Sequence, residues 1–102
     1  MVIEVGQFKF NELTADEFAA LDKAMVESYV AHQPGFVRRS AGYIAEDNKW
    51  VFIAYWKDAA SAQNSTDGFM DSELTADFRA HIDFDSFTNG VYEQTMPLES
   101  AS

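Results

Sequence analysis

The sequence contains no cysteine, and this absence excludes disulfide bonds, thiolate nucleophiles and thiolate metal sites. It also lacks any apolar run near the roughly 18 residues needed to cross a bilayer. The first ten residues, MVIEVGQFKF, have neither the basic start nor the long apolar core of a secretory signal. We therefore expect a cytoplasmic protein.

Basic residues are scarce: 7 Lys and Arg face 17 Asp and Glu, so the formal net charge is −10. Nucleic acids and anionic membranes would be repelled by such a chain, and we exclude both as partners. The 2 histidines are too few for a zinc site, which takes three or four ligands, so no metal site is predicted. Hydrophobic residues make up 47% of the 102 residues, which suits one folded domain with a real core.

One stretch, WVFIAYW from Trp50 to Trp56, is apolar or aromatic at every position. Alternate side chains of a strand point to opposite faces, so even-numbered positions here share one face and odd-numbered positions the other. Both faces are apolar, and aromatic and β-branched residues favour a strand. This pattern predicts an inner strand of a sheet that is covered on both sides.

The remaining pattern predicts elements that alternate with this strand. Thr14 and Glu17 have the spacing of a capping box at a helix start, and a three-residue polar turn at 46–48 predicts a β-hairpin. We find no repeat or linker, and predict one domain at 1–95 and a tail at 96–102. The predicted elements are strands at 2–10, 36–45, 50–56 and 82–94, and helices at 15–32, 58–68 and 72–81, with a bulge or bend at Asn89-Gly90.

This order of elements is that of the split βαβ, or ferredoxin-like, α+β fold with a four-stranded antiparallel sheet. Both helical regions would cover one face of the sheet and leave the other bare. A bare apolar face is uncommon on a soluble monomer, so we expect a homodimer that forms through the open sheet face. Space left between helices and sheet would be lined by aromatic side chains and would suit a small apolar ligand.

The segment His32 to Phe36 (HQPGF), the hairpin, the apolar strand 50–56 and the following Lys57 to Ala60 (KDAA) together resemble the antibiotic biosynthesis monooxygenase family. The resemblance covers about residues 2–94 and implies a dimeric α/β barrel. The family includes cofactor-independent oxygenases of aromatic polyketides and quinols, and also haem degraders. The haem degraders carry an Asn in the first strand and a Trp in the second helix, where this chain has Gln7 and no Trp near Gln63. The resemblance therefore implies no cofactor.

Two kinds of polar residue are candidates for a catalytic role. His81 shares a predicted helical stripe with Phe78. It would be a proton acceptor or a haem ligand at the cavity mouth, or a hydrogen-bonded structural histidine. Arg38 and Arg39 fall on opposite faces of the second strand, and each would pair with a carboxylate or orient an anionic substrate. The small aromatic substrate would contact side chains that could equally belong to the core or the dimer interface, namely Trp50, Trp56, Tyr43 and Tyr55.

Three functions remain open at this stage. The first is a cofactor-independent monooxygenase that oxidises a small aromatic such as a quinol, with His81 as the base and Arg38, Tyr43, Trp50, Tyr55 and Trp56 binding the substrate. The second is a non-catalytic dimer that binds a small ligand, and the third is a dimer without a sizeable cavity. A pocket of about 300 Å³ or more with His81 at its wall would favour the first two functions.

Overall fold

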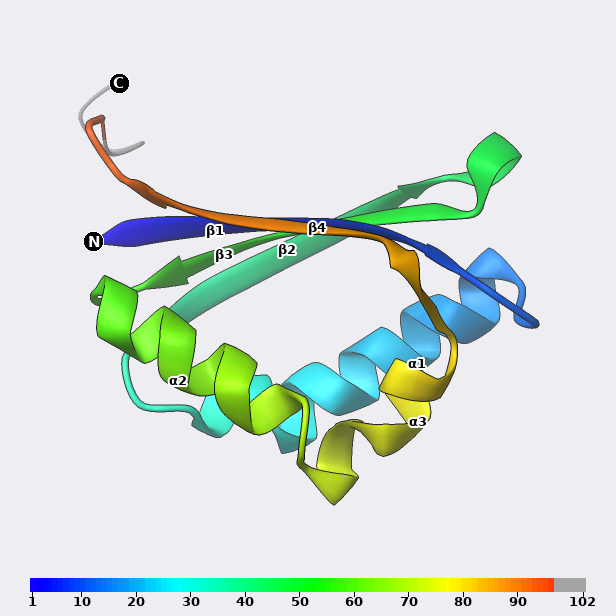
Figure 1. The fold of residues 1–102 in the computed structure, drawn as a ribbon, viewed down its shortest axis with the longest axis horizontal. Coiled ribbons are helices and arrows are strands. Elements are labelled where there is room, and N and C mark those ends of the chain that lie inside the picture. The colour runs from blue at the N-terminus through cyan, green and yellow to red at the C-terminus, as the bar shows by residue number, and fades with distance from the viewer. Residues whose placement is uncertain (97–102) are drawn as a thin grey trace.

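Four strands form one antiparallel sheet in the order β2-β3-β1-β4 in the computed structural model, which describes residues 1–96 (Figure 1). The elements confirm the predicted order, and three 3₁₀ turns lie between them. In chain order the helices and strands are β1 (Val2–Phe10), α1 (Ala15–Ser28), β2 (Phe36–Ile44), β3 (Lys49–Trp56), α2 (Ala59–Phe69), α3 (Ala76–Ala80) and β4 (Ile82–Glu93). Of the predicted tail at 96–102, only Met96 belongs to the described part of the chain.

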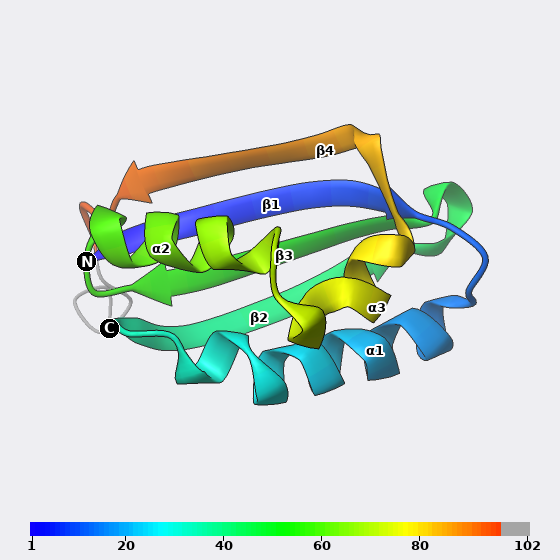
Figure 2. The same ribbon diagram turned by 60° about the horizontal axis from the view of Figure 1, so that its bottom comes forward.

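The helices α1, α2 and α3 all lie on one face of the sheet (Figures 1 and 2). The apolar strand β3 is an inner strand as predicted, paired with β2 on one side and β1 on the other. The fold is therefore the predicted ferredoxin-like α+β arrangement. The sheet is not closed, and its edges are β2 and β4.

Helix α1 begins where the sequence predicts and ends earlier. The Thr14 hydroxyl accepts a hydrogen bond from the Glu17 amide at 3.2 Å, and the Glu17 carboxylate accepts one from the Thr14 amide at 2.9 Å. The hydrogen bond from the Thr14 amide, with a smaller contribution from the Thr14 hydroxyl, lowers the pKa of the Glu17 carboxyl. The helix stops at Ser28 rather than residue 32, because Tyr29 leaves helical geometry and a 3₁₀ turn, η1 (Val30–His32), follows.

The predicted helix at 72–81 is wrong as a single helix. The segment forms a 3₁₀ turn, η3 (Glu73–Thr75), followed by the short helix α3. Leu74 is consequently 59% exposed while Phe78 is buried, so these two residues do not share a stripe. The predicted irregularity at Asn89-Gly90 is also misplaced. Both residues pair regularly with β1, and the register between β1 and β4 shifts instead between Gln7 and Lys9.

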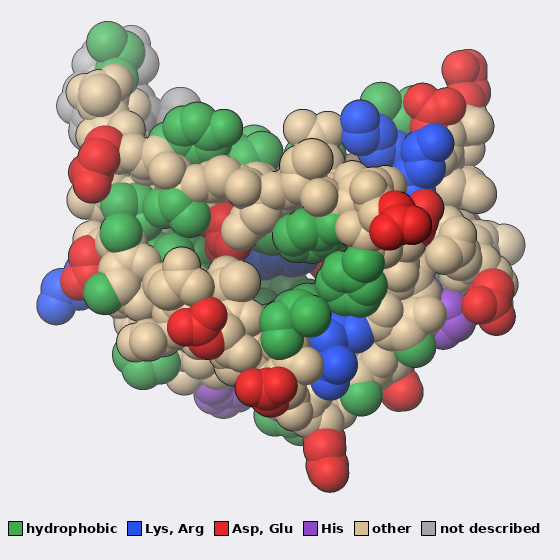
Figure 3. Space-filling model, viewed as in Figure 1, with side chains coloured by type: hydrophobic (Ala, Val, Ile, Leu, Met, Phe, Trp, Pro, Cys, Tyr) green, Lys and Arg blue, Asp and Glu red, His purple; other side chains and the backbone are tan. Residues whose placement is uncertain are grey.

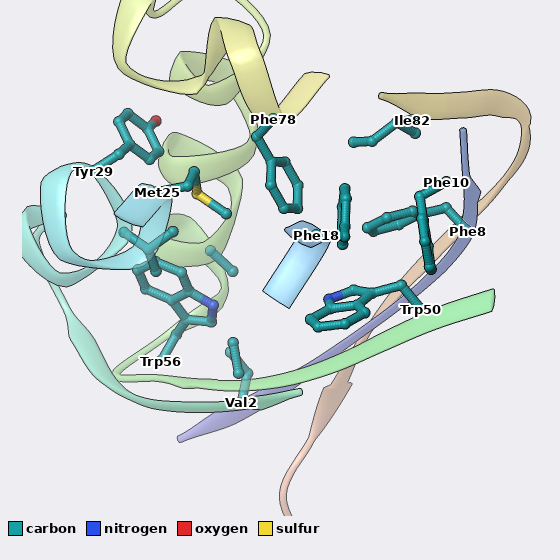
Figure 4. Close-up of a cluster of buried hydrophobic side chains, with 13 residues drawn as sticks. Val2, Phe8, Phe10, Phe18, Met25, Tyr29, Trp50, Trp56, Phe78 and Ile82 are labelled. Carbon is teal, nitrogen blue, oxygen red and sulfur yellow. The ribbon is translucent and has the colours of Figure 1, made fainter. Parts of the chain in front are cut away.

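The core lies between the sheet and the helices, and its side chains form two groups (Figure 4). Trp56, Met25 and Tyr29 gather at one end. The other group is aromatic and surrounds Phe18, which stacks on Phe10 at 4.7 Å between ring centroids and meets Trp50 edge-on at 5.0 Å. Such aromatic pairs each contribute about 0.5–1.5 kcal/mol beyond the area they bury.

No helix or strand among residues 1–96 covers the opposite face of the sheet. Ile53, at the middle of β3, is 39% exposed, and Ile44 and Tyr92 on the same face are more exposed. The prediction that β3 is covered on both faces is therefore confirmed for the face under the helices, and the other face is exposed within residues 1–96. Within residues 1–96, no helix has the length and apolar character to span a membrane.

Candidate functional site

A cavity of about 60 Å³ lies between the helix-covered face of the sheet and the helices. Side chains from all four strands and all three helices line it. Figure 3 shows a hollow rimmed by hydrophobic side chains between β4 and the helix layer. The cavity therefore lies inside the fold and opens at the β4 edge of the sheet.

Five phenylalanines belong to the cavity wall. Phe8 of β1 stacks on Phe87 of β4 with ring centroids 5.8 Å apart, and it meets Phe78 of α3 edge-on at 5.9 Å. Phe69, at the end of α2, also meets Phe78 edge-on. Phe52 of β3 completes this set. The wall offers several aromatic faces and edges to a planar ring.

One carboxylate interrupts this apolar wall. Glu4 of β1 is only 6% exposed, and its Oε1 accepts a hydrogen bond from Trp56 Nε1 at 2.9 Å. Its Oε2 accepts from Asn89 Nδ2 at 3.0 Å and from Thr66 Oγ1 at 3.4 Å. The donors come from β3, β4 and α2, so the carboxylate joins three elements at the cavity.

The other charged residue of the wall is neutralised by a partner. Arg39 of β2 makes a bidentate ion pair with Asp22 of α1, at 2.7 and 2.8 Å. Its guanidinium carbon also lies 4.7 Å from the centroid of the Phe52 ring. In contrast, no Lys or Arg nitrogen among residues 1–96 lies within 4.0 Å of the Glu4 carboxylate. The cavity thus carries one uncompensated negative group.

Among the aromatic residues predicted to bind substrate, Trp56 lines the cavity. Trp50 is buried in the aromatic group of the core and is not part of the cavity wall. Tyr43 stacks on Trp50 with centroids 6.1 Å apart and is half exposed. These two residues therefore extend the core toward one end of the sheet.

Arg38 and Tyr55, which were also predicted to bind substrate, lie on the open face of the sheet. Their positions are opposite in the β2–β3 register, and the Arg38 guanidinium carbon lies 4.5 Å from the centroid of the Tyr55 ring. Neither residue lines the cavity. The structure therefore separates this pair from Trp56, which faces the helices.

His81, the predicted base, lies at the C-terminal end of α3 and does not line the cavity. Its Nδ1 is 3.1 Å from the backbone oxygen of Asn11, just after β1. Asn11 follows Glu4 by seven residues, which at the rise of a strand is roughly 20 Å. His81 and the buried carboxylate therefore occupy different parts of the molecule.

The cavity is smaller than the pocket of about 300 Å³ that the sequence analysis used as its criterion. Of its five polar wall residues, Arg39 was a candidate from the sequence, whereas Glu4, Ser65, Thr66 and Asn89 were not predicted as site residues. A signal existed for Glu4, since strand alternation places it on the same face as Val2 and Phe8. Among residues 1–96, no three His, Asp or Glu side chains come together to hold a metal ion.

Comparisons with known proteins give the family. None of the curated proteins matches this chain at a significant level. Among solved structures, SnoaB, a cofactor-independent oxygenase from Streptomyces nogalater, is 26% identical, has a TM-score of 0.72, and matches over 95% of each chain. A crystal structure named antibiotic biosynthesis monooxygenase (18% identity, TM-score 0.70, 94% of this chain and 100% of the other) and Rv0793 from Mycobacterium tuberculosis (13%, 0.66, 95% and 97%) share the fold. The family model for antibiotic biosynthesis monooxygenases matches residues 1–83. The chain belongs to the antibiotic biosynthesis monooxygenase family.

Proposed function

We propose that this protein is a cofactor-independent monooxygenase that oxidises a small electron-rich aromatic compound, such as a quinol or an anthrone. The observation that carries the proposal is the aromatic cavity with one buried carboxylate, Glu4, that has no cationic partner among the described residues. The 26% identity to the oxygenase SnoaB over nearly the whole chain supports it.

The reaction needs a proton acceptor, and we propose Glu4 for this role in place of His81. Glu4 lines the cavity, whereas His81 lies away from it beside Asn11. A base must come within hydrogen-bond reach of the proton that it takes. The hydrogen bonds from Trp56 and Asn89 hold the Glu4 carboxylate in one orientation, as such a role requires.

For an anthrone, the steps balance with oxygen as the only oxidant. Glu4 takes the proton of the enol hydroxyl, and the electron-rich anion passes one electron to O₂. The radical pair joins in a C–O bond at the opposite ring carbon, and the proton on Glu4 returns to the peroxide. Loss of the remaining C–H proton and of hydroxide then gives a carbonyl and water. The protein supplies an aromatic-lined cavity that shields the anion from water.

An aromatic ring needs more space than the cavity offers at rest. A cavity of about 150 Å³ accommodates benzene, more than twice the 60 Å³ found here. Phe69 and Phe87 belong to the two elements that flank the opening, α2 and β4, and both are only partly buried. We propose that their rings move aside when the substrate enters.

The test is oxygen uptake by purified protein in air-saturated buffer with a panel of anthrones and quinols. We expect uptake above the rate of substrate autoxidation, abolished by heat denaturation of the protein. Glu4→Gln should remove it, whereas His81→Gln, a change outside the cavity, should retain it. Uptake that equals the rate with denatured protein would contradict the proposal, and binding without uptake would favour a ligand-binding protein. Haem, added separately, serves as a control for spectral binding.

We also propose that two copies pair through the open sheet face. The exposed apolar side chains of Ile44, Ile53 and Tyr92 on this face support the pairing, since patches of this kind mark interfaces. Light scattering should give twice the chain mass for the wild type and one chain mass for Ile53→Glu. Leu74→Glu, at an exposed leucine away from the sheet, is the matched control and should remain a dimer. A monomeric wild type would contradict the pairing.

A further inference from the structure

Glu4 has a free acceptor position at the cavity. A carboxylate has about four lone-pair positions, two on each oxygen. Among residues 1–96, Oε2 accepts hydrogen bonds from both Asn89 and Thr66, whereas Oε1 accepts only the one from Trp56. Oε1 therefore retains room for one more donor, and Glu4 is part of the cavity wall.

The charges around the cavity favour a neutral ligand. Arg39 and Asp22 cancel one another in a bidentate pair, and Glu4 adds one negative charge. An anionic ligand would meet a like charge in surroundings where water screens little. Arg39, with two guanidinium nitrogens already bound to Asp22, presents no free cation to attract it.

We infer that Glu4, held by Trp56, is the specificity-determining residue of the cavity: it recognises the hydroxyl of a neutral phenol or enol and excludes ring carboxylates. This inference rests on the proposed function and names its substrate class. The ring packs among Phe8, Phe52 and Phe78, and the hydroxyl donates to Glu4 Oε1. A carboxylate brings no donor to this position and adds a second negative charge.

The indole N–H of Trp56 provides a spectroscopic signal for this contact. The protein has 2 tryptophans, and only Trp56 donates its indole N–H to Glu4. The indole N–H of Trp50 is buried and has no acceptor among residues 1–96. The two indole N–H signals in an NMR spectrum of ¹⁵N-labelled protein therefore separate the site from the core.

The experiment measures binding and needs no turnover. Phenol, anisole, toluene and benzoate are titrated into the labelled protein while both indole signals are followed. We expect phenol to move the Trp56 signal, to leave the Trp50 signal in place, and to bind about tenfold more tightly than anisole, because a hydrogen bond to a charged acceptor is lost in the ether. Benzoate should produce no shift at concentrations that saturate with phenol.

Glu4→Gln is the matched variant, because glutamine keeps the shape and can still accept from Trp56. It should weaken phenol binding about tenfold and leave toluene binding within about twofold. Benzoate binding as tight as phenol, equal affinities for phenol and anisole, or unchanged phenol affinity in Glu4→Gln would each overturn the inference. The comparison of phenol with anisole uses the wild type, so it tests the inference even if the variant does not fold. Glu4-dependent binding without oxygen uptake would overturn the proposed oxygenase alone.

Discussion

Arg39 on the edge strand β2 and Asp22 on α1 bind one another through two parallel hydrogen bonds, and both side chains are less than one-tenth exposed. The pair fastens the helix to the edge of the sheet beside the cavity. Of the two roles considered for the arginines of the second strand, Arg39 thus has the pairing with a carboxylate. The other, Arg38, lies on the open face over Tyr55.

Removing one member of this pair should destabilise the protein strongly. Arg39→Met leaves the Asp22 carboxylate buried without its cation, and losses of about 3–5 kcal/mol are typical of such changes. Urea denaturation at one fixed protein concentration measures the free energy of unfolding. Arg38→Met, a matched change at an exposed position, should cost less than about 1 kcal/mol.

The double variant Arg39→Met/Asp22→Leu separates loss of the attraction from the cost of an unpaired buried charge. It should be more stable than Arg39→Met, because no charge remains to be desolvated. A double variant as unstable as the sum of its two single variants would show that the side chains act independently.

A second prediction concerns the contact between Gly6 of β1 and Phe52, which lie opposite one another in the sheet. A Cβ atom added at Gly6 would overlap the Phe52 ring, so the ring must move in Gly6→Ala. Because Phe52 lines the cavity and lies under Arg39, both would shift. We expect a loss of about 1–3 kcal/mol in the free energy of unfolding and weaker phenol binding.

Gly42→Ala is the control for this substitution, because a Cβ there meets nothing within 4 Å. It should change stability by less than about 0.5 kcal/mol. Adding Phe52→Leu to Gly6→Ala should restore part of the lost stability, since the smaller side chain relieves the contact. Equal effects of the two glycine substitutions would contradict the steric explanation.

The fold could be predicted because its signals are local. The capping box at Thr14, the polar turn before the strand and the all-apolar run from Trp50 to Trp56 each specify one element. The order of those elements then leaves few topologies. The end of α1 and the break before α3 depended on tertiary contacts, such as the hydrogen bond from the Tyr29 hydroxyl to the Ser65 carbonyl at 2.7 Å.

The cavity could not be predicted in the same way, because its polar cluster is assembled from distant positions. Glu4 and Asn89 are 85 residues apart, and their contact depends on the pairing of β1 with β4. His81 attracted attention as a histidine on an apolar stripe, but the break in the helix leaves it beside Asn11. A carboxylate on a core-facing strand position, as at Glu4, was the more informative signal.

A third prediction concerns acid stability at the start of α2. The Asp58 side chain accepts hydrogen bonds from the hydroxyl and the amide of Ser61, and these lower the pKa of Asp58 from its usual 3.8. A lowered pKa in the folded state contributes stability that is present above the unfolded value and is lost as the pH falls through the folded value. The contribution should therefore disappear on acidification below about pH 4.

Asp58→Asn keeps a capping oxygen but removes the charge. It therefore tests directly whether the ionised Asp58 side chain stabilises the protein above its pKa. The wild type should be the more stable of the two at pH 7, and the difference should shrink as the pH falls below about 4. Thermal unfolding across this pH range measures both proteins. A difference that stays constant with pH would mean that the charge of Asp58 contributes nothing to the cap.

The last prediction concerns access to the cavity through Phe87. This ring is partly buried, lines the cavity and stacks on Phe8, so Phe87→Ala opens space beside the β4 edge. We expect a stability loss of about 1–3 kcal/mol, below the 3–5 kcal/mol typical of a fully buried phenylalanine. Removing a ring that must move should favour larger ligands, and the affinity for 1-naphthol relative to phenol should rise about tenfold.

Phe84→Ala is the matched control, because Phe84 lies on the same strand and contacts Phe87 but is exposed and does not line the cavity. It should leave the ratio of the two affinities within about twofold of the wild-type value. If Phe84→Ala changes the ratio as much as Phe87→Ala, the effect comes from loosening of β4 rather than from the ring at the opening. If neither changes it, ligands enter without displacing Phe87, and the movement must be sought at Phe69 on the other side of the opening.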